Sequence, residues 1–389
     1  MASIISYTLK NGNKRYMYSM YGGLDPQTGK PKHVLKRGFK TKKEATLAAS
    51  RKELAISQGD VQKVNNILFS QVYEQWYQEY VNTVRESTWA RTAGMFNNHI
   101  LPAFGNKRIR TITINQVQRA VNKWYKAVSY NYKRWYEYTV AIFDFALKHG
   151  YMHGDNPATK ITMPKKKESW GSKPENFWDK QQLTTFFNCI DPNTELEKFT
   201  LFRVLAFAGV RRGECLALTW NDVNFSKSTL TVNKTLTQGK RGKQIIQPPK
   251  THKGRREVSL DPTTMNYLKR WRAHQKREYL LLGFNTMNKG QLIFANSKNK
   301  FKSLNTPAKW LNKIIKDYNA THTDELKRIT VHGFRHTSAS MLFAAGATIK
   351  EVQTRLGHED AQTTLNIYTH VTKHQDNQAA EKLANYFDN

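Results

Sequence analysis

The chain has 389 residues, enough for two or three domains with hydrophobic cores of their own. Its 62 lysines and arginines exceed its 30 acidic residues and give a formal charge of +32, so the expected partner is a polyanion such as nucleic acid. Because 39% of the residues are hydrophobic and 12% are aromatic, the composition excludes a disordered basic tail. We expect a folded protein that binds DNA or RNA.

The sequence carries no predicted signal for secretion or for a membrane. Its N-terminus lacks a long apolar core and a small-residue cleavage site, and no apolar run is long enough to cross a bilayer. Cys189 and Cys215 are too few for a disulfide framework or a thiolate metal cluster. These features predict a protein of the reducing cytoplasm.

The first block, residues 1–62, is predicted to be a small DNA-binding domain. Residues 15–21 alternate as a strand does, and residues 32–39 are its expected partner after a turn at residues 25–29. The segment from Thr41 to Glu44 has the pattern of a capping box, which opens a helix. The pattern predicts a three-stranded sheet with one helix. A solubilising appendage is the alternative.

The second block, residues 63–161, is predicted to be helical. One helix carries its apolar and aromatic side chains on a single face, at Phe69, Val72, Trp76 and Tyr80. Ser87 is expected to cap a second helix that ends at Ile100, and a connector is expected over residues 101–109. Two further helices are expected over Asn115–Lys126 and Tyr130–Lys148.

Aromatic side chains of this block are expected to pack in its core and not to stack on bases, namely Trp124, Trp135, Tyr136, Phe143 and Phe145. Basic side chains of the block are candidates to contact phosphates, namely Lys123, Lys126, Lys133 and Arg134. Residues 162–176 are rich in lysine, glycine, serine and proline without periodicity, which is typical of a basic linker along DNA.

The third block, residues 177–389, is predicted to be mixed α/β. Its expected elements are helices at Asp179–Cys189 and Leu196–Ala208, and short strands near Thr229–Val232, Ile245–Gln247 and Arg256–Leu260. Residues 379–386 have an amphipathic pattern, predicting a tail helix that docks on a neighbouring subunit or packs within its own. The whole chain is therefore predicted to be multidomain, mainly α with small β-sheets.

The segment from Gly209 to Glu214, Gly-Val-Arg-Arg-Gly-Glu, follows an apolar helix. Arg211 and Glu214 are three residues apart in the next predicted helix, so their side chains are neighbours. We expect Arg211 to contact phosphate and Glu214 to orient it or a nearby backbone group. An ordinary surface ion pair is the alternative for this motif alone.

The segment from His332 to His336, His-Gly-Phe-Arg-His, opens another predicted helix, whose positive end favours an anion. The two histidines have the i, i+4 spacing of zinc ligands. However, no glutamate follows His332 and no cysteine lies nearby, which argues against zinc. The motif predicts anion binding by Arg335, with neither a metal nor another cofactor.

Gly357-His358 and then Tyr368 complete the set of motifs. Two arginines, two histidines and a tyrosine are the groups needed to cut DNA without a metal. Arginines hold the negative charge of a phosphodiester, and a tyrosine can attack its phosphorus. A half-buried aromatic residue is the alternative for Tyr368 alone.

In order and residue type, these motifs resemble those of the tyrosine recombinases, of the integrase type found in temperate phages and conjugative transposons. The family pattern of Arg, Lys, His-x-x-Arg, His and Tyr is matched by Arg211, Lys250, His332, Arg335, His358 and Tyr368. The same hairpin turn as Lys250 also holds Lys253, Arg255 and Arg256. Arg212 lies beside Arg211, but the family spacing to Glu214 favours Arg211.

The resemblance covers nearly the whole chain. Residues 1–62 are similar to the arm-type DNA-binding domain of the family, and residues 63–161 to its helical core-binding domain, down to His99-Ile-Leu-Pro-Ala-Phe-Gly105. Residues 177–389 are similar to the catalytic domain. The implied function is the integration and excision of a mobile element.

The resemblance implies a role for each matched residue. Tyr368 attacks the phosphorus, His332 is the general base, and Lys250 protonates the departing 5′ oxygen. Arg211 and Arg335 hold the non-bridging oxygens, and His358 adds a hydrogen bond to the same phosphate. The product is a 3′-phosphotyrosine and a free 5′-hydroxyl.

The implied partners are double-stranded DNA attachment sites with core and arm sequences, a homotetramer that holds two duplexes, an excisionase and a host DNA-bending protein, in a bacterial cell. Two rival functions remain. A type IB topoisomerase uses similar chemistry on one duplex, but it needs no separate DNA-binding block. A non-catalytic sequence-specific DNA-binding regulator needs no intact set of catalytic residues.

Overall fold

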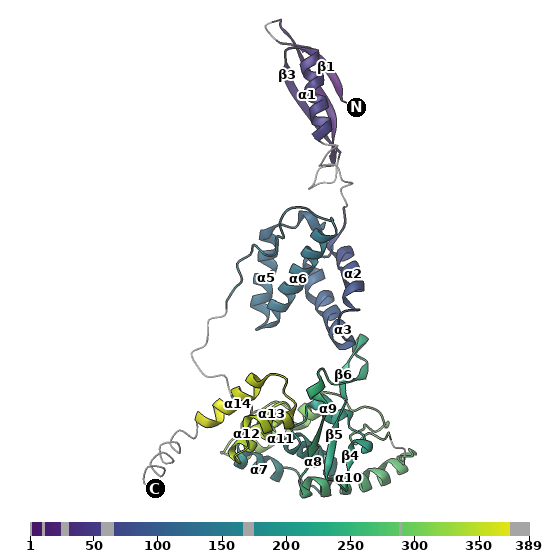
Figure 1. Ribbon diagram of the computed structural model, residues 1–389, viewed down its shortest axis with the longest axis vertical. Coiled ribbons are helices and arrows are strands. Elements are labelled where there is room, and N and C mark those ends of the chain that lie inside the picture. The colour runs from purple at the N-terminus through teal and green to yellow at the C-terminus, as the bar shows by residue number, and fades with distance from the viewer. Residues whose placement is uncertain are drawn as a thin grey trace. The chain divides into compact units, whose positions relative to one another are not determined.

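The computed structural model describes residues 2–9, 12–24, 31–55, 66–165, 175–287 and 290–373 (Figure 1). The chain divides into two units, residues 1–168 and residues 169–389. None of the helices in the described ranges is long and apolar enough to span a membrane. The predicted turn at residues 25–29 and the predicted tail helix at residues 379–386 lie outside these ranges.

The first unit begins with a three-stranded antiparallel sheet and one helix, as predicted. The strands pair in chain order, and the elements are β1 (Ser3–Thr8), β2 (Lys14–Leu24), β3 (Pro31–Phe39) and α1 (Lys42–Ala55). Alternate side chains of β2, including Tyr18 and Met20, form a small core with Ala49 of α1. The hydroxyl of Thr41 accepts the Glu44 N–H at 3.2 Å, which confirms the predicted start of the helix.

The rest of this unit is a helical domain with an aromatic core. Its main helices are α2 (Phe69–Tyr80), α3 (Glu86–Met95), α5 (Ile114–Ala127) and α6 (Asn131–Lys148). Trp124, Trp135, Phe143 and Phe145 are buried, and Tyr136 packs against them partly buried, so these aromatics are core as predicted. The four basic candidates for phosphate contact are exposed.

Two predictions about α3 are wrong. The helix begins at Glu86 with Arg85 as its N-cap, so Ser87 lies inside the first turn and does not cap it. The chain also stays helical past Ile100, through a π-helical turn (η2, Phe96–Ile100) and α4 (Leu101–Phe104). Pro102 lies in the first turn of α4, directly after the π-helical turn.

The second unit has one large core, and its helices are α7 (Lys180–Asn188), α8 (Leu196–Phe207), α9 (Arg212–Ala217), α10 (Pro262–Leu281), α11 (Thr306–Asn319), α12 (Gly333–Ala344), α13 (Ile349–Leu356) and α14 (Ala361–Lys373). Helix α14 packs against α12 and α13, and Figure 1 shows these three together. The fold therefore gathers the C-terminal motif helices in one place.

The strands of this unit form two small antiparallel sheets. One has the order β4 (Val223–Asn224), β5 (Thr229–Val232) and β8 (Arg256–Ser259), and the other is the hairpin of β6 (Thr235–Gln238) and β7 (Gln244–Gln247). The predicted strands correspond to β5, β7 and β8. Strands β4 and β6 were not predicted.

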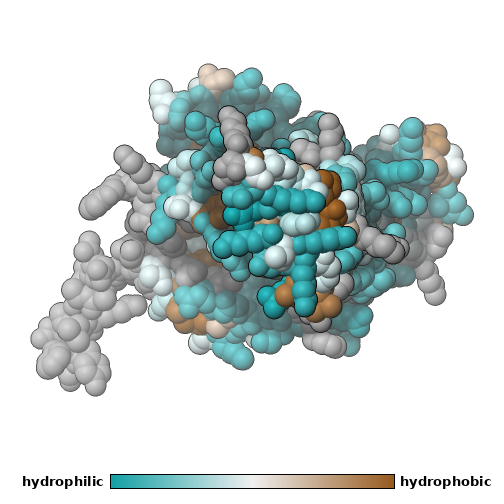
Figure 2. Space-filling view, turned by 90° about the horizontal axis from the view of Figure 1, so that it is seen from above, coloured by the Kyte–Doolittle hydropathy of each residue, from teal (hydrophilic) through white to brown (hydrophobic). Residues whose placement is uncertain are grey.

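The surface facing the viewer in Figure 2 is mostly hydrophilic, with apolar residues in small separate patches. This agrees with a chain whose formal charge is +32.

Candidate active site

Arg335 is the buried centre of the site. It lies in the first turn of α12 and is 1% exposed. Its guanidinium donates to the carbonyl oxygens of Gly209, at 2.8 Å, and Leu356, and to Nε2 of His358 at 3.2 Å. Arg335 thereby ties the turn after α8 to the end of α13. Burial, followed by the nearby charges of Arg211 and Arg256, lowers the pKa of Arg335 to about 9, so it remains a cation at neutral pH.

Arg211 is the N-cap of α9, one residue before the helix in which it was expected. Glu214 accepts the Arg211 backbone N–H at 2.9 Å and its Nη1 at 2.8 Å. The Glu214 side chain is 3% exposed and that of Arg211 is 42% exposed. The predicted neighbours therefore form an ion pair, with the carboxylate inside and the guanidinium accessible to a substrate.

Gly209 lets the segment before Arg211 approach α12 and α13 closely. Its φ of +61° lies in the left-handed region, and a Cβ here would lie 2.4 Å from Cδ2 of Leu356 and 3.1 Å from Oγ of Ser338. Its carbonyl oxygen is the one that accepts from Arg335. Only glycine fits this place without displacing the neighbouring side chains.

Arg256 is a site residue that the sequence did not assign. Its Nη2 donates to the second oxygen of Glu214 at 2.9 Å. Burial raises the pKa of Glu214, but the positive charges of Arg256 and Arg211 outweigh this and lower it to about 2. Glu214 is therefore a permanent anion shared by two arginines. No sequence signal distinguishes Arg256 from the other basic residues of its turn, because its partner lies 42 positions away.

His332 and His336 lie one helical turn apart, with ring centroids 4.8 Å apart and planes at 87°. Burial, followed by the charges of His336, Arg335 and Arg211, lowers the pKa of His332 to about 4. The pKa of His336 is also lowered, by burial and then by Arg335. His332 is thus neutral at pH 7 and can accept a proton. The described residues contain no group of three or more potential metal ligands.

His358 follows Gly357, which ends α13 in the left-handed conformation. Its Nε2 accepts from Arg335, and its Nδ1 lies 2.8 Å from the hydroxyl of Thr364. Burial, followed by the charge of Arg335, lowers the pKa of His358 to about 3, so the ring is neutral. In this arrangement neither ring nitrogen is left to donate to a phosphate. The expected hydrogen bond from His358 to the phosphate requires the ring to exchange these partners.

Tyr368 lies in α14, one turn after Thr364, so the two side chains share a face of the helix. Its ring packs against Phe343 of α12, with centroids 5.1 Å apart and planes at 75°. Tyr368 is 38% exposed. The structure thus holds Tyr368 beside the helix of Arg335 and connects it to His358 through Thr364.

Lys250 is exposed, in the turn that precedes β8. The next lysine of this turn, Lys253, approaches the His358 loop, with its Nζ 3.5 Å from the carbonyl oxygen of Glu359. The backbone also packs tightly, because a Cβ at Gly357 would lie 2.5 Å from the carbonyl oxygen of Lys253. The turn therefore reaches the site, through contacts that include those of Lys253 and Arg256.

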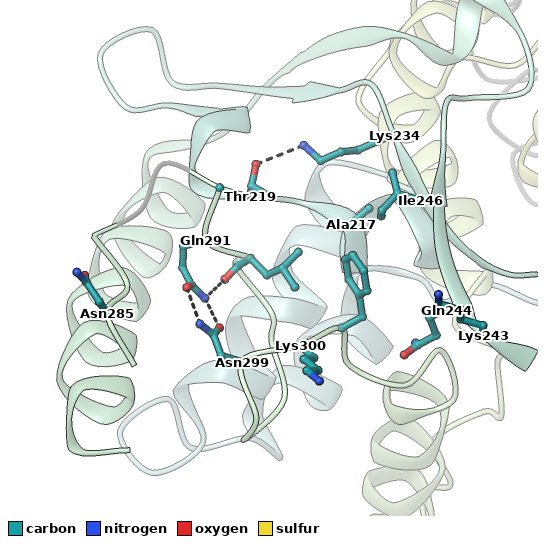
Figure 3. A pocket seen from close by; sticks show the side chains of 13 residues that line it. Ala217, Thr219, Lys234, Lys243, Gln244, Ile246, Asn285, Gln291, Asn299 and Lys300 are labelled. Carbon is teal, nitrogen blue, oxygen red and sulfur yellow. Dashed lines mark hydrogen bonds between the residues drawn. The ribbon is translucent and has the colours of Figure 1, made fainter. Parts of the chain in front are cut away.

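A cavity of about 680 Å³ lies elsewhere in this unit, between the β6–β7 hairpin and residues 285–301 (Figure 3). None of the six matched residues lines it. Lys234, another lysine between the two arginine motifs, donates there to Thr219 and Asp222, which hold its ammonium. The matched residues therefore lie outside this hollow, and the Arg211 and Tyr368 side chains are partly exposed.

Three family models match along the chain. The phage integrase family matches residues 176–375, the N-terminal SAM-like domain of phage integrases matches residues 68–125, and the arm DNA-binding domain matches residues 5–56. The chain belongs to the phage integrase family. Members of this family are tyrosine recombinases, and the activity is site-specific recombination of mobile elements. The predicted family, enzyme class and function are confirmed.

Two relatives match over nearly all of their length. A XerC-like tyrosine recombinase of Caldanaerobacter subterraneus subsp. tengcongensis is 29% identical, with all of both chains covered. The ICEBs1 integrase of Bacillus subtilis is 24% identical, over 96% of this chain and 98% of its own.

Solved structures of integrases share the fold. The Tn1549 transposon integrase, in complex with a circular intermediate DNA, has a TM-score of 0.66 at 20% identity, over 82% of this chain and 99% of that one. A lambda integrase dimer bound to a core site has a TM-score of 0.56 at 16% identity, over 93% of each chain. These likenesses confirm the predicted fold class. The domain boundaries at residues 62, 161 and 176 stay predictions.

Proposed function

We propose that Arg211, Lys250, His332, Arg335, His358 and Tyr368 form one catalytic centre, which cuts and rejoins DNA through a 3′-phosphotyrosine. The observation that carries this proposal is the bonded series from Arg335 through His358 to Thr364, one helical turn before Tyr368. This series of hydrogen bonds connects the buried guanidinium of Arg335 to α14, the helix that carries Tyr368.

The reaction begins when Oη of Tyr368 attacks the phosphorus. A free phenol has a pKa near 10, so its proton must leave as the new bond forms, and neutral His332 accepts it. Arg211 and Arg335 stabilise the charge that grows on the non-bridging oxygens. Lys250 protonates the 5′ oxygen as its bond to phosphorus breaks.

The phosphotyrosine retains the energy of the broken phosphodiester. The 5′-hydroxyl of another DNA end can therefore attack it, release Tyr368 and seal a new junction. Energy from a nucleotide is not required, and every atom of the reaction comes from DNA and from the six proposed catalytic side chains.

The DNA partners follow from the domain matches and the relatives. The basic charge and the arm DNA-binding match support binding at arm sites, and the core-site complex of lambda integrase supports binding at the crossover. A lambda integrase tetramer binds a Holliday junction, which supports a tetramer here. Because one chain that spans arm and core sites needs bent DNA, we include a host bending protein and an excisionase, in the bacterial cytoplasm.

Replacing Tyr368 with phenylalanine tests the proposal. A duplex with the junction sequence of the element and a nick beside the scissile bond traps the covalent product. We expect the Tyr368→Phe chain to bind this duplex with unchanged affinity and to form no adduct, because the ring can still pack on Phe343. Tyr318→Phe, which removes a phenol from α11, should form the adduct normally. An adduct that survives in Tyr368→Phe would remove this residue from its role.

A joining assay separates recombination from the rival functions. Incubation with two attachment-site duplexes should yield recombinant molecules. Relaxation of supercoiled DNA without joined products would favour the topoisomerase-like function. Binding without any covalent product would favour the regulator.

A further inference from the structure

Glu214 is a buried carboxylate shared unequally by two arginines. One oxygen accepts Nη1 of Arg211 at 2.8 Å, and the other accepts the Arg211 N–H and Nη2 of Arg256, both at 2.9 Å. The Arg256 side chain is 6% exposed, whereas that of Arg211 is 42% exposed. Arg256 is therefore the inner partner, and Arg211 faces the substrate side.

Arg256 also holds the end of α13. Its Nε donates to the carbonyl oxygen of Arg355 at 2.9 Å, and its Nη1 donates to that of Gly254 at 3.2 Å. A cation is favourable at this end of a helix, where the last carbonyl groups lack partners. Arg335 caps the next carbonyl, that of Leu356. Two arginines thus fix the helix end from which His358 follows.

The charges of Glu214, Arg211 and Arg256 give Arg256 a role beside Arg211. A single carboxylate neutralises one guanidinium. If Arg256 were absent, Glu214 would pair with Arg211 alone and weaken the attraction of Arg211 for a phosphate. With Arg256 present, the three groups carry one net positive charge, and Arg211 is the accessible member.

We propose that Arg256 is a positioning residue for strand transfer: it neutralises Glu214, which leaves the charge of Arg211 available to the scissile phosphate, and it holds the end of α13 in front of His358. This inference rests on the proposed function of the site. It assigns Arg256 no contact with DNA.

The first test is a double-mutant cycle in the full-length chain with Arg256→Met, Glu214→Gln and both together. The single-turnover rate of adduct formation and the affinity for the nicked duplex are measured. We expect Arg256→Met to slow the adduct about 10- to 100-fold, since it misplaces a charge-stabilising group. The double variant should be no slower than Arg256→Met, because the carboxylate that would capture Arg211 is gone. Losses that multiply would overturn the proposal.

Arg255→Met is the matched control, since it removes the same charge from the neighbouring exposed position. Both methionine variants should lose DNA affinity to the same small extent, with Arg255→Met keeping the wild-type adduct rate. Equal rate losses in the two variants would overturn the proposal, because the effect would then come from overall charge.

A substrate change provides a readout that a folding defect would not move. A methylphosphonate at the scissile position lacks the negative charge of the non-bridging oxygen, so Arg211 contributes less. We expect the rate ratio of wild type to Arg256→Met to shrink at least about fivefold on this substrate. An unchanged ratio would show that Arg256 does not act through the phosphate charge.

Arg256→Lys keeps the test decisive if the methionine variant does not fold. Lysine retains the charge but cannot donate to three acceptors in the planar fork of a guanidinium. A folded Arg256→Lys chain with a slower adduct supports the proposal, and one with the wild-type rate overturns the part in which the guanidinium holds the end of α13. Failure of the proposed function is seen separately, as an adduct that survives in Tyr368→Phe.

Discussion

Arg335 donates a hydrogen bond from its Nε to Nε2 of His358, at 3.2 Å, inside the second unit. A guanidinium nitrogen donates only, so Nε2 carries no proton in this arrangement. The proton is then on Nδ1, which donates to the hydroxyl of Thr364 at 2.8 Å. This relationship fixes the tautomer of His358 and makes Thr364 the connection to the helix of Tyr368.

Replacement of Thr364 by valine should therefore impair catalysis. Valine has a similar shape but no acceptor, which leaves the buried Nδ1–H without a partner at a cost of about 1–3 kcal/mol. We expect adduct formation to slow about tenfold, with unchanged DNA affinity, as His358 and α14 lose their connection.

Two matched variants complete this test. Thr364→Ser keeps the hydroxyl and should retain most of the rate. Thr369→Val removes a hydroxyl that bonds within the same helix, to the carbonyl oxygen of Leu365, and should have little effect. A wild-type rate in Thr364→Val would show that the hydroxyl plays no part.

The elements that the sequence predicted best are those specified by local patterns. The expected helix over Asn115–Lys126 corresponds to α5 because three apolar residues, Val117, Val121 and Trp124, recur at helical spacing and are all buried. A short strand was expected near Thr229–Val232, which are the bounds of β5, and its alternate residues are buried. Local signals failed after Ile100, where a connector was expected but the chain stays helical through α4.

At the candidate site, too, local sequence patterns predicted the motifs but not the contacts between segments that are distant in the sequence. The order of the motifs predicted the candidate catalytic residues. It did not predict the pairing of Glu214 with Arg256 or of His358 with Arg335. These contacts join segments 23 to 42 positions apart, and the fold of the whole unit decides them. The sequence likewise could not decide which lysine of the hairpin turn is the general acid, because the fold of the whole unit decides which of them approaches the site.

A substrate with a better leaving group should identify the general acid. If sulfur replaces the bridging 5′ oxygen, the departing thiolate needs no proton, because thiols are far more acidic than alcohols. We expect the Lys250→Ala chain to cleave normal DNA about 100-fold more slowly than the wild-type chain. It should cleave the sulfur substrate at close to the wild-type rate.

Lys253→Ala is the control for this assignment, since Lys253 lies in the same turn and approaches Glu359. Its rate should show no rescue by sulfur. Rescue of Lys253→Ala, with none for Lys250→Ala, would transfer the role of general acid to Lys253. Rescue of Lys234→Ala would point instead to the lysine held by Asp222.

The pH dependence of cleavage should reflect the depressed pKa of His332. Its ordinary value is about 6.5, and burial with the surrounding positive groups lowers it to about 4, so the proton-accepting form persists from pH 8 down to about pH 5. The apparent second-order rate constant for adduct formation, which reports the free enzyme, should therefore not fall between pH 7.5 and 5.5 through this group.

His332→Gln should be slower across this whole range, because it cannot accept a proton. Rates measured at low enzyme concentration against pH provide the comparison. A loss of activity with a midpoint near pH 6.5 that disappears in His332→Gln would mean that His332 titrates normally and is more open to water than the structure shows.

Gly209 and Gly283 offer a matched pair for measuring how tightly the site is packed. Both have positive φ, +61° and +80°, so alanine at either position carries a conformational cost of about 1–2 kcal/mol. A Cβ at Gly283 would meet nothing within 4 Å, whereas one at Gly209 would lie 2.4 Å from Leu356. Since Leu356 is fully buried, overpacking should add about 1–3 kcal/mol at Gly209.

Urea unfolding of the full-length chain, followed by tryptophan fluorescence, would measure this difference. We expect Gly209→Ala to lower the free energy of unfolding of the second unit by roughly 2–5 kcal/mol and Gly283→Ala by about 1–2 kcal/mol. Gly209→Ala should also slow adduct formation, because the carbonyl of residue 209 accepts from Arg335 and precedes Arg211 by two residues. Equal effects of the two substitutions would mean that Leu356 yields to the added methyl group, and that the approach of this turn to α13 is not what holds Arg211 in place.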